Sequence, residues 1–289
     1  MNLKKMLYID RRIIYLLVAA GALVPIIRPI GLPVMPTKPV AALYDAVEKL
    51  GPENAVIVSF DYGPSSEPEL NPMAEAIFRH LFARKIKVVV MAMFPLGGNE
   101  EAKSELNKVA AEYDLQYGVD YVNLGYKEGG QAVMKRMAVS IPDLFPADTE
   151  GKPTAGMPIM AQVKNYTNVS LLISLATGVI GEWWANLVNP QFGVPVSVGC
   201  TAVSAPKYYA YLRAGQMMSL LGGLKGASEY EKLVKAGYPL IRQVYEKPEV
   251  KKVAATTGMD VQSIVHVVII AFIVFGNVIY FATRKEGSK

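Results

Sequence analysis

Five segments rich in glycine and hydroxyl residues hold the side chains of this sequence that could do chemistry, and each follows a short apolar run. In the first, DYGPSS, the Asp61 carboxylate could orient a ligand hydroxyl or a cation, or it could form an Asx turn or cap the next helix. Glycines let backbone N–H groups approach an anionic ligand, although ordinary turns favour the same residues. Ten residues of these segments are our candidate ligand-binding residues: Asp61, Ser65, Ser66, Gly97, Gly98, Lys127, Glu128, Thr177, Cys200 and Thr201.

Catalysis has less support in the sequence. The chain contains no Walker A motif, no G-x-G-x-x-G after its first predicted strand and no G-x-S-x-G. Cys200 would need a histidine base, but His80 falls inside a predicted helix and His266 inside an apolar segment. One cysteine and two histidines exclude an internal disulfide and most zinc sites. We therefore expect a buried thiol at Cys200, and no catalytic residue, metal or cofactor.

The apolar runs alternate with helical patterns. Short β-branched runs predict five strands, and spacings of three and four predict amphipathic helices between them. Near-continuous apolar strands separated by helices are typical of a mostly parallel sheet covered on both faces, here a doubly wound, Rossmann-like α/β domain. Ligands of such sheets bind at the carboxyl ends of the strands. The predicted strands are 55–60, 86–93, 120–124, 169–175 and 194–199.

Two apolar segments flank this domain. Residues 261–282 carry no formal charge and are long enough to cross a membrane as a helix. Residues 13–27 are shorter; a helix there could reach Val34 if Arg28 extends to the interface, and a cleaved signal peptide is the alternative. We expect an N-terminal tail and anchor over 1–34, an α/β domain over 35–258, and a transmembrane helix with a basic tail over 259–289.

The charge distribution supports anchoring rather than nucleic-acid binding. The 289 residues are 52% apolar, 19% are charged and the formal net charge is +5. Residues 1–12 carry +3 and residues 283–289 carry +2, so the remainder is neutral. Because basic residues gather at the cytoplasmic ends of spans, we expect two spans, cytoplasmic termini and an extracytoplasmic domain; a cytoplasmic domain is the alternative.

A long segment, 142–168, is rich in proline and glycine and has no clear periodicity, which is typical of a lid or a contact surface. The stretches VSFDYGPSSEPELNPMAEAIFRHLF, VNLGYKEGGQAV and VGCTAVSAPKYYAYLRAGQMMSLLGGLKGASEYEKL resemble parts of an uncharacterised prokaryotic family of membrane-anchored α/β proteins. The resemblance covers most of the central domain and implies no activity and no functional residue.

These observations favour a non-enzymatic subunit of a larger membrane assembly, because a neutral domain tethered at both ends is held close to the bilayer. Its partners would be the lipid bilayer and either copies of itself or other membrane-protein subunits, with no nucleic acid. A membrane-tethered small-molecule binder or sensor, using the strand-end crevice, is the first alternative. A hydrolase or transferase using Asp61, Lys127, Glu128 or Cys200 is the second.

Overall fold

The computed structural model describes residues 10–286, with side chains as far as Thr283. Its chain divides into two compact units, residues 34–245 and residues 1–33 with 246–289. Lys4, Lys5 and Lys289, which contributed to the prediction of sidedness, lie outside the described residues.

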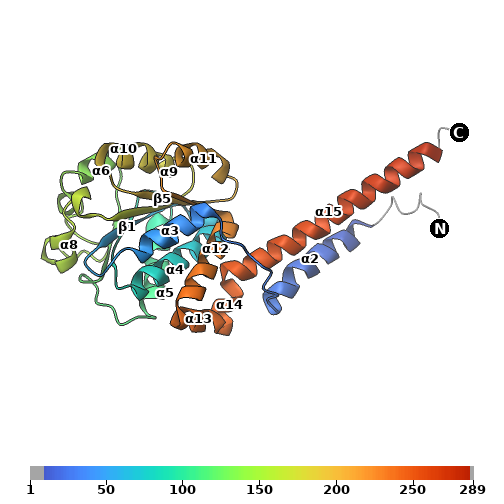
Figure 1. The fold of residues 1–289 in the computed structure, drawn as a ribbon, viewed down its shortest axis with the longest axis horizontal. Coiled ribbons are helices and arrows are strands. Elements are labelled where there is room, and N and C mark those ends of the chain that lie inside the picture. Colours follow the sequence, from blue (N-terminus) through green and yellow to red (C-terminus); the bar gives the residue numbers. More distant parts are fainter. Residues whose placement is uncertain (1–9, 287–289) are drawn as a thin grey trace. The chain divides into compact units, whose positions relative to one another are not determined.

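A six-stranded sheet, all of it parallel, forms the centre of the first unit (Figure 1). In the strand order β3-β2-β1-β4-β5-β6, the chain adds strands outward from β1 to β3 on one side and from β4 to β6 on the other, as in doubly wound sheets. The prediction of an α/β fold with a parallel sheet is confirmed. The strands are β1 (Ala55–Asp61), β2 (Lys87–Ala92), β3 (Tyr121–Tyr126), β4 (Leu171–Ala176), β5 (Val196–Cys200) and β6 (Ser219–Gly222).

The predicted number of five strands is wrong because the sequence pattern over 206–224 indicates a single helix, whereas the structure forms β6 within this range. The helix α11 (Ala205–Arg213) stops earlier, and Gly215 follows with φ of +72°, a left-handed conformation that favours glycine. The next residues then pair with β5, Ser197 opposite Ser219. Their hydroxyls share a buried hydrogen bond of 2.8 Å.

Helices cover both faces of the sheet (Figure 1). One face carries α3 (Lys38–Glu48), α4 (Glu67–Ala83), α5 (Gly98–Ala110) and α12 (Gly223–Gly237). The other carries α6 (Gln131–Met137), α9 (Ile180–Trp183), α10 (Asn189–Phe192) and α11, with a π-helical turn at Trp184–Val188. The remaining elements of this unit are α7 (Ile141–Leu144), α8 (Pro158–Gln162), α13 (Pro239–Glu246) and the 3-10 turns Pro64–Ser66, Thr154–Gly156 and Tyr166–Asn168.

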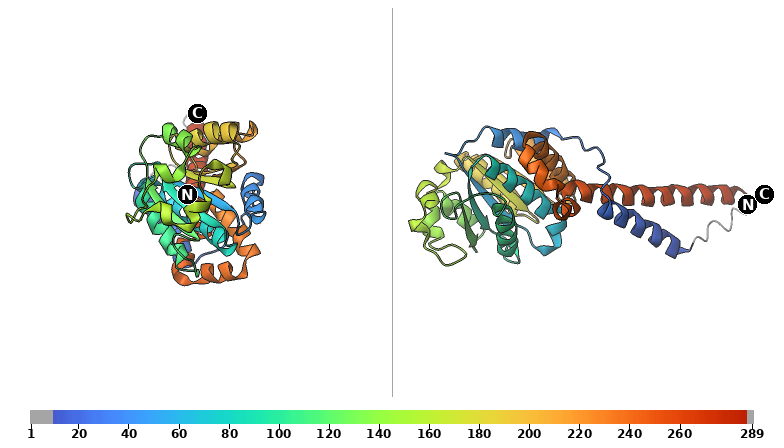
Figure 2. Two further views of the ribbon diagram at one scale, coloured as in Figure 1. Left: turned by 90° about the vertical axis from the view of Figure 1, so that its left-hand side faces the viewer. Right: turned by 90° about the horizontal axis from the view of Figure 1, so that it is seen from below.

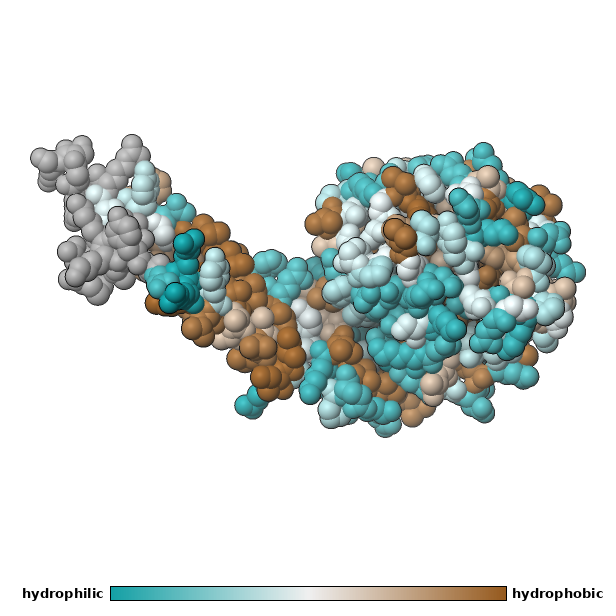
Figure 3. Space-filling model, turned by 180° about the vertical axis from the view of Figure 1, so that it is seen from behind, coloured by the Kyte–Doolittle hydropathy of each residue, from teal (hydrophilic) through white to brown (hydrophobic). Residues whose placement is uncertain are grey.

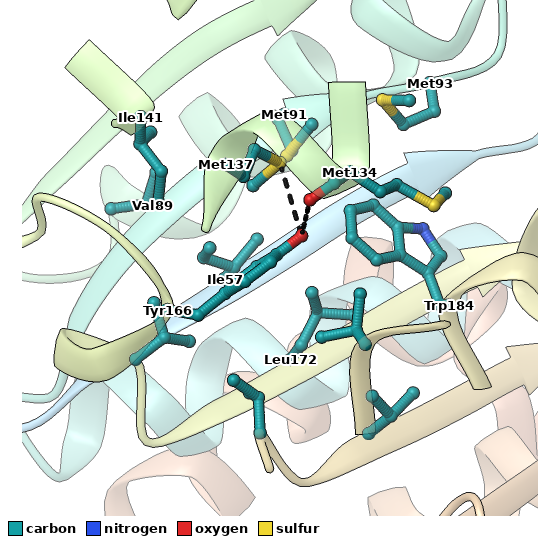
Figure 4. Close-up of a cluster of buried hydrophobic side chains, with 14 of the residues drawn as sticks. Ile57, Val89, Met91, Met93, Met134, Met137, Ile141, Tyr166, Leu172 and Trp184 are labelled. Carbon is teal, nitrogen blue, oxygen red and sulfur yellow. Dashed lines mark hydrogen bonds between the residues drawn. The ribbon is translucent and has the colours of Figure 1, made fainter. Parts of the chain in front are cut away.

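A hydrophobic core lies between the sheet and the second of these layers (Figure 4). Ile57, Val89 and Leu172 contribute from three neighbouring strands and are at most 1% exposed. Tyr166 crosses this core, and its buried hydroxyl donates to the Met134 carbonyl over 2.8 Å. Burial of these side chains supplies most of the driving force for folding of the unit.

The segment 142–168 covers the edge strand β3 instead of forming an open lid. The Thr149 N–H donates to the Asn123 carbonyl over 3.1 Å, and Ala147 and Pro153 form an isolated antiparallel bridge. Phe145 and several other apolar side chains of the segment belong to the core. Core packing and these backbone contacts hold the segment although it lacks periodicity, and the edge strand that it covers is less accessible for pairing with another chain.

The second unit is built on two helices that pack side by side, α2 (Arg11–Ile27) and α15 (Ala255–Glu286), preceded by α14 (Pro248–Val253) (Figure 2). Gly21 lets them approach, since a Cβ there would lie 3.3 Å from Ile264 Cγ2. The Asp260 carboxylate accepts from the backbone N–H groups of Ile30, Gly31 and Leu32 over 2.7–2.9 Å. The chain after α2 is thereby fastened to the start of α15, so the two helices are antiparallel.

Among the described residues, one helix is long and apolar enough to cross a membrane, over Ala255–Thr283. Its 29 residues extend about 43 Å, against a hydrocarbon thickness of about 30 Å. The apolar segment 13–27 lies in α2, a helix of 17 residues and about 25 Å that ends at Ile27, so the extension to Val34 does not form. Pro25, Pro29 and Pro33 explain the early end, because proline removes a backbone donor. The prediction of two membrane-spanning helices is therefore supported for the C-terminal helix alone.

Candidate functional site

The carboxyl ends of β1 and β4 mark the position where the strand order reverses and where doubly wound sheets bind ligands. Asp61 is the last residue of β1 and is fully buried. The Thr177 N–H, just after β4, donates to the Asp61 carbonyl over 3.0 Å. The side chain of Asp61 therefore determines what this position can do.

Four donors surround the Asp61 carboxylate. Oδ1 accepts from Ser59 Oγ over 2.7 Å and from the Met93 N–H over 3.1 Å. Oδ2 accepts from Ser174 Oγ over 2.6 Å and from Trp184 Nε1 over 2.8 Å. Burial raises the pKa of Asp61 to about 6, and the hydrogen bonds from Ser174, Ser59 and Trp184 oppose that rise. The carboxylate joins three strand ends to the π-helical turn and has no exposed oxygen for a ligand.

Ser65 and Ser66 lie apart from this carboxylate. Both belong to the 3-10 turn Pro64–Ser66; Ser65 is exposed, and Ser66 is buried with its N–H donating to the Gly63 carbonyl. Neither is among the four donors to Asp61. The predicted grouping of an acid with two hydroxyls is therefore not formed in this conformation.

Gly97 and Gly98 allow close backbone packing where α5 begins. Gly97 has φ of +90°, and a Cβ on it would lie 2.7 Å from Pro64 Cδ. A Cβ on Gly98 would lie 2.7 Å from the Phe60 carbonyl oxygen. Both positions need glycine for this packing, which does not itself require a ligand.

Thr177, Cys200 and Thr201 lie at the ends of β4 and β5. The Cys200 thiol is buried, and burial raises its pKa to about 12, which disfavours the nucleophilic thiolate. The Thr201 hydroxyl donates to Ser204 Oγ over 3.1 Å. His80 is occupied elsewhere, with Nδ1 2.8 Å from the Tyr230 hydroxyl and Nε2 2.8 Å from Glu48 Oε1. This end of the sheet thus holds no thiolate–imidazole pair.

A cavity of about 370 Å³ lies instead at the carboxyl end of the edge strand β3. Lys127 lines it, whereas Glu128 is exposed and is not part of its lining. The sequence prediction missed the other polar lining groups, which lie on distant segments. The lining residues are Asn99, Leu124, Gly125, Tyr126, Lys127, Leu144, Phe145, Pro146, Ala147, Asp148 and Thr149.

The two charged side chains at this cavity differ in whether they have hydrogen-bond or ion-pair partners. The Asp148 carboxylate accepts from the Tyr117 hydroxyl over 2.7 Å and from the N–H groups of Glu150 and Lys152 over 2.8 Å each. The Lys127 ammonium lies 5.8 Å from the centroid of the Phe145 ring and has no ion-pair partner among the side chains that the structure describes. The arrangement can bind an anion, but it offers no paired acid and base for catalysis.

Over residues 10–286, no group of three or more histidine, cysteine, aspartate or glutamate side chains is placed to hold a metal ion. Comparisons of the chain with models of protein families, with curated proteins and with solved structures find no match. Its function therefore has to be argued from the geometry described above.

Proposed function

We propose that this protein is a non-enzymatic, membrane-anchored subunit of a larger membrane assembly, made of copies of itself or of other membrane-protein subunits. The observation that carries the proposal is the apolar surface of α15. Val267, Ile270 and Phe281 are 57–66% exposed, and apolar surface extends along the pair of helices α2 and α15 in Figure 3. A soluble monomer rarely exposes so large a contiguous apolar area, whereas a bilayer would cover it.

The proposal includes α2 as a second, shorter span. Its Tyr15, Leu16 and Ile27 are 67–76% exposed, and the antiparallel packing on α15 would bring both termini to one side. Arg11, Arg12 and the basic tail after Thr283 favour cytoplasmic termini and an extracytoplasmic α/β domain. A local thinning of the bilayer would accommodate the 17 residues of α2.

Exposed apolar side chains at the carboxyl edge of the sheet support the role in an assembly. Leu96, Val179 and Val203 follow β2, β4 and β5, and they are 74%, 51% and 89% exposed. We call these three residues the edge patch. Because Asp61 beneath this edge is closed to solvent, protein contact accounts for the edge patch better than catalysis does.

Membrane attachment is tested by washing native membranes with alkaline carbonate. The wild-type chain should stay in the pellet, whereas Ile270→Lys combined with Val274→Lys should reduce the retained fraction. Each lysine costs about 2.5–3.5 kcal/mol at the centre of a span. Val139→Lys changes an exposed apolar residue of the α/β domain and is the matched control. Release of the wild-type chain into the supernatant would refute the anchor.

Assembly is tested by mass photometry of protein extracted in mild detergent. We expect particles larger than one chain, and fewer of them for Leu96→Asp combined with Val203→Asp than for the control Val139→Asp. A strict monomer with no co-purifying protein would refute the assembly while leaving the anchor intact.

Sidedness is tested separately, with a cysteine at the exposed Ser104 of α5. An impermeant maleimide should label Ser104→Cys in intact cells, and the buried Cys200 of the wild-type chain provides the background. Labelling that requires permeabilised cells would place the domain in the cytoplasm.

A further inference from the structure

The cavity at the end of β3 is lined by one amide side chain that the fold leaves without partners, and a second such amide lies on the strand that leads to it. Both ends of the Asn99 side-chain amide lack a hydrogen bond in the described part of the chain, and Oδ1 is buried as well. Asn123, on the strand that leads into the cavity, is 3% exposed; its Oδ1 accepts from the Gly125 N–H over 3.0 Å, but its Nδ2 is unpaired. A buried amide end without a partner costs about 1–3 kcal/mol, which a bound molecule can recover.

The space beside Asn99 depends on glycine. Gly125 has φ of +80°, and a Cβ on it would lie 2.9 Å from Thr149 Cγ2 and 3.6 Å from Asn99 Oδ1. A side chain at this position would therefore collide with Thr149 and would lie in van der Waals contact with the Asn99 amide. The glycine thus keeps open the part of the cavity where the unpaired amide lies.

The charged groups at the cavity indicate where an anionic group would bind. The Asp148 carboxylate keeps its charge but accepts three hydrogen bonds from within the chain, whereas the Lys127 ammonium has no ion-pair partner among the side chains that the structure describes. The helix α5 begins beside the cavity without a side-chain cap, so its first backbone N–H groups are available as donors, although Glu100 and Glu101 in the first turn offset the positive end of the helix. A ligand with a carboxylate that can reach Lys127 is therefore expected.

The size and shape of the cavity limit the class of ligand further. About 370 Å³ is at the small end of ligand pockets, and Leu144 and Phe145 provide apolar walls. Half a turn of the Asn99 amide exchanges its donor and acceptor ends, so it can bind a hydroxyl or an amino group. We infer that this cavity is a binding site for a small organic acid that carries a hydroxyl or amino group, with its carboxylate on Lys127 and its hydroxyl or amine on Asn99. This site is separate from the proposed assembly surface.

The experiment measures the binding of lactate, L-alanine, propionate and inorganic phosphate to the full chain in mild detergent, by calorimetry. Lactate or L-alanine should bind with a dissociation constant of about 1 mM or tighter. Propionate, which lacks the second polar group, should bind at least about tenfold more weakly, the effect of roughly one hydrogen bond.

Two substitutions assign the contacts. Lys127→Met keeps an apolar stem against Phe145 but removes the charge, so it should raise the dissociation constants of all the organic acids at least about tenfold. Lys135→Met, on the exposed part of α6, is the matched control and should bind as wild type. Asn99→Leu should abolish the preference for lactate or L-alanine over propionate without changing propionate binding. Circular dichroism checks the fold, and Lys127→Gln replaces Lys127→Met if the latter misfolds.

Three results would overturn the inference: no binding of any probe at about 10 mM, equal binding of propionate or phosphate and the best substituted acid, or unchanged binding by Lys127→Met. Because the membrane and assembly experiments do not use these residues, the binding site can fail while the proposed function stands, and the reverse also holds.

Discussion

Replacing Asp61 by asparagine should change how the stability of the α/β domain depends on pH. The carboxyl group has a folded-state pKa of about 6, against 3.8 for an aspartate in water, because burial disfavours its charged form. An acid with a raised pKa binds more protons in the folded than in the unfolded state between these values. Its ionisation therefore lowers the free energy of unfolding as the pH rises from about 4 to about 6.

The magnitude follows from the two pKa values. A difference of about two pH units corresponds to about 3 kcal/mol at 1.36 kcal/mol per unit. Asparagine does not titrate, so the free energy of unfolding of the variant does not decrease in this way. However, its Nδ2 must face either the Met93 N–H or the Trp184 Nε1–H, both of which can only donate. That mismatch costs about 1–3 kcal/mol at every pH.

The two effects give a specific expectation. Asp61→Asn should be less stable than wild type at pH 4, and the difference should move in favour of the variant by about 3 kcal/mol by pH 7. Urea unfolding of the full chain in detergent, followed by far-ultraviolet circular dichroism at a series of pH values, measures this. All other titrating groups are shared, so the difference isolates Asp61.

A pH-independent difference would refute the reasoning. It would mean that the four donors outweigh burial and keep the carboxylate ionised throughout. A variant that loses relative stability as the pH rises would contradict it more strongly.

Three further predictions use the same unfolding or exchange measurements. Burial, followed by repulsion from Glu75, raises the pKa of Glu105 to about 7, so Glu105→Gln should stabilise the chain at pH 8 by about 1–3 kcal/mol. In contrast, Glu112→Gln should destabilise the chain, because it removes the carboxylate that lies 2.6 Å from the buried Arg79 guanidinium. In Gly199→Ala the new Cβ would press against Met73 and would lie 2.7 Å from Leu175 Cδ2, so this substitution should lower the free energy of unfolding by about 1–3 kcal/mol. Gly156→Ala places its Cβ in open space and should leave the stability nearly unchanged. Asp260→Ala should raise hydrogen exchange at the amides of Ile30, Gly31 and Leu32 at least about tenfold, and unchanged protection there would contradict the hydrogen bonds assigned to Asp260.

Local patterns were sufficient for most of the central sheet. The β-branched run before Asp61 and the apolar run before Cys200 each lie in a buried strand, because burial on both faces requires uninterrupted apolar residues. The four residues of β6 are too few for a periodic signal, and their two leucines also suit a helix. The end of α2 at Ile27 was predictable, because Arg28 and Pro29 follow the apolar segment and proline stops a helix.

The candidate site was less predictable because it depends on contacts distant in sequence. Lys127 could be chosen from its place after a predicted strand, but nothing local indicates that residues 144–149 form the opposite wall. Likewise, Asp61 was correctly placed at a strand end, yet its burial depends on Ser174 and Trp184, more than a hundred residues away. Side-chain accessibility is determined by packing, which a single sequence does not specify.

The three hydrogen bonds to Asp260 have a consequence for how the chain is made. They join residues separated by as many as 230 positions, so α2 emerges from the ribosome long before its partner helix has been synthesised. At about 5–20 residues per second, roughly 10–50 s of translation elapse in which α2 must be shielded by lipid or a chaperone. The α/β domain can complete its folding in that interval, and closure of the helix pair is therefore a late, post-translational event.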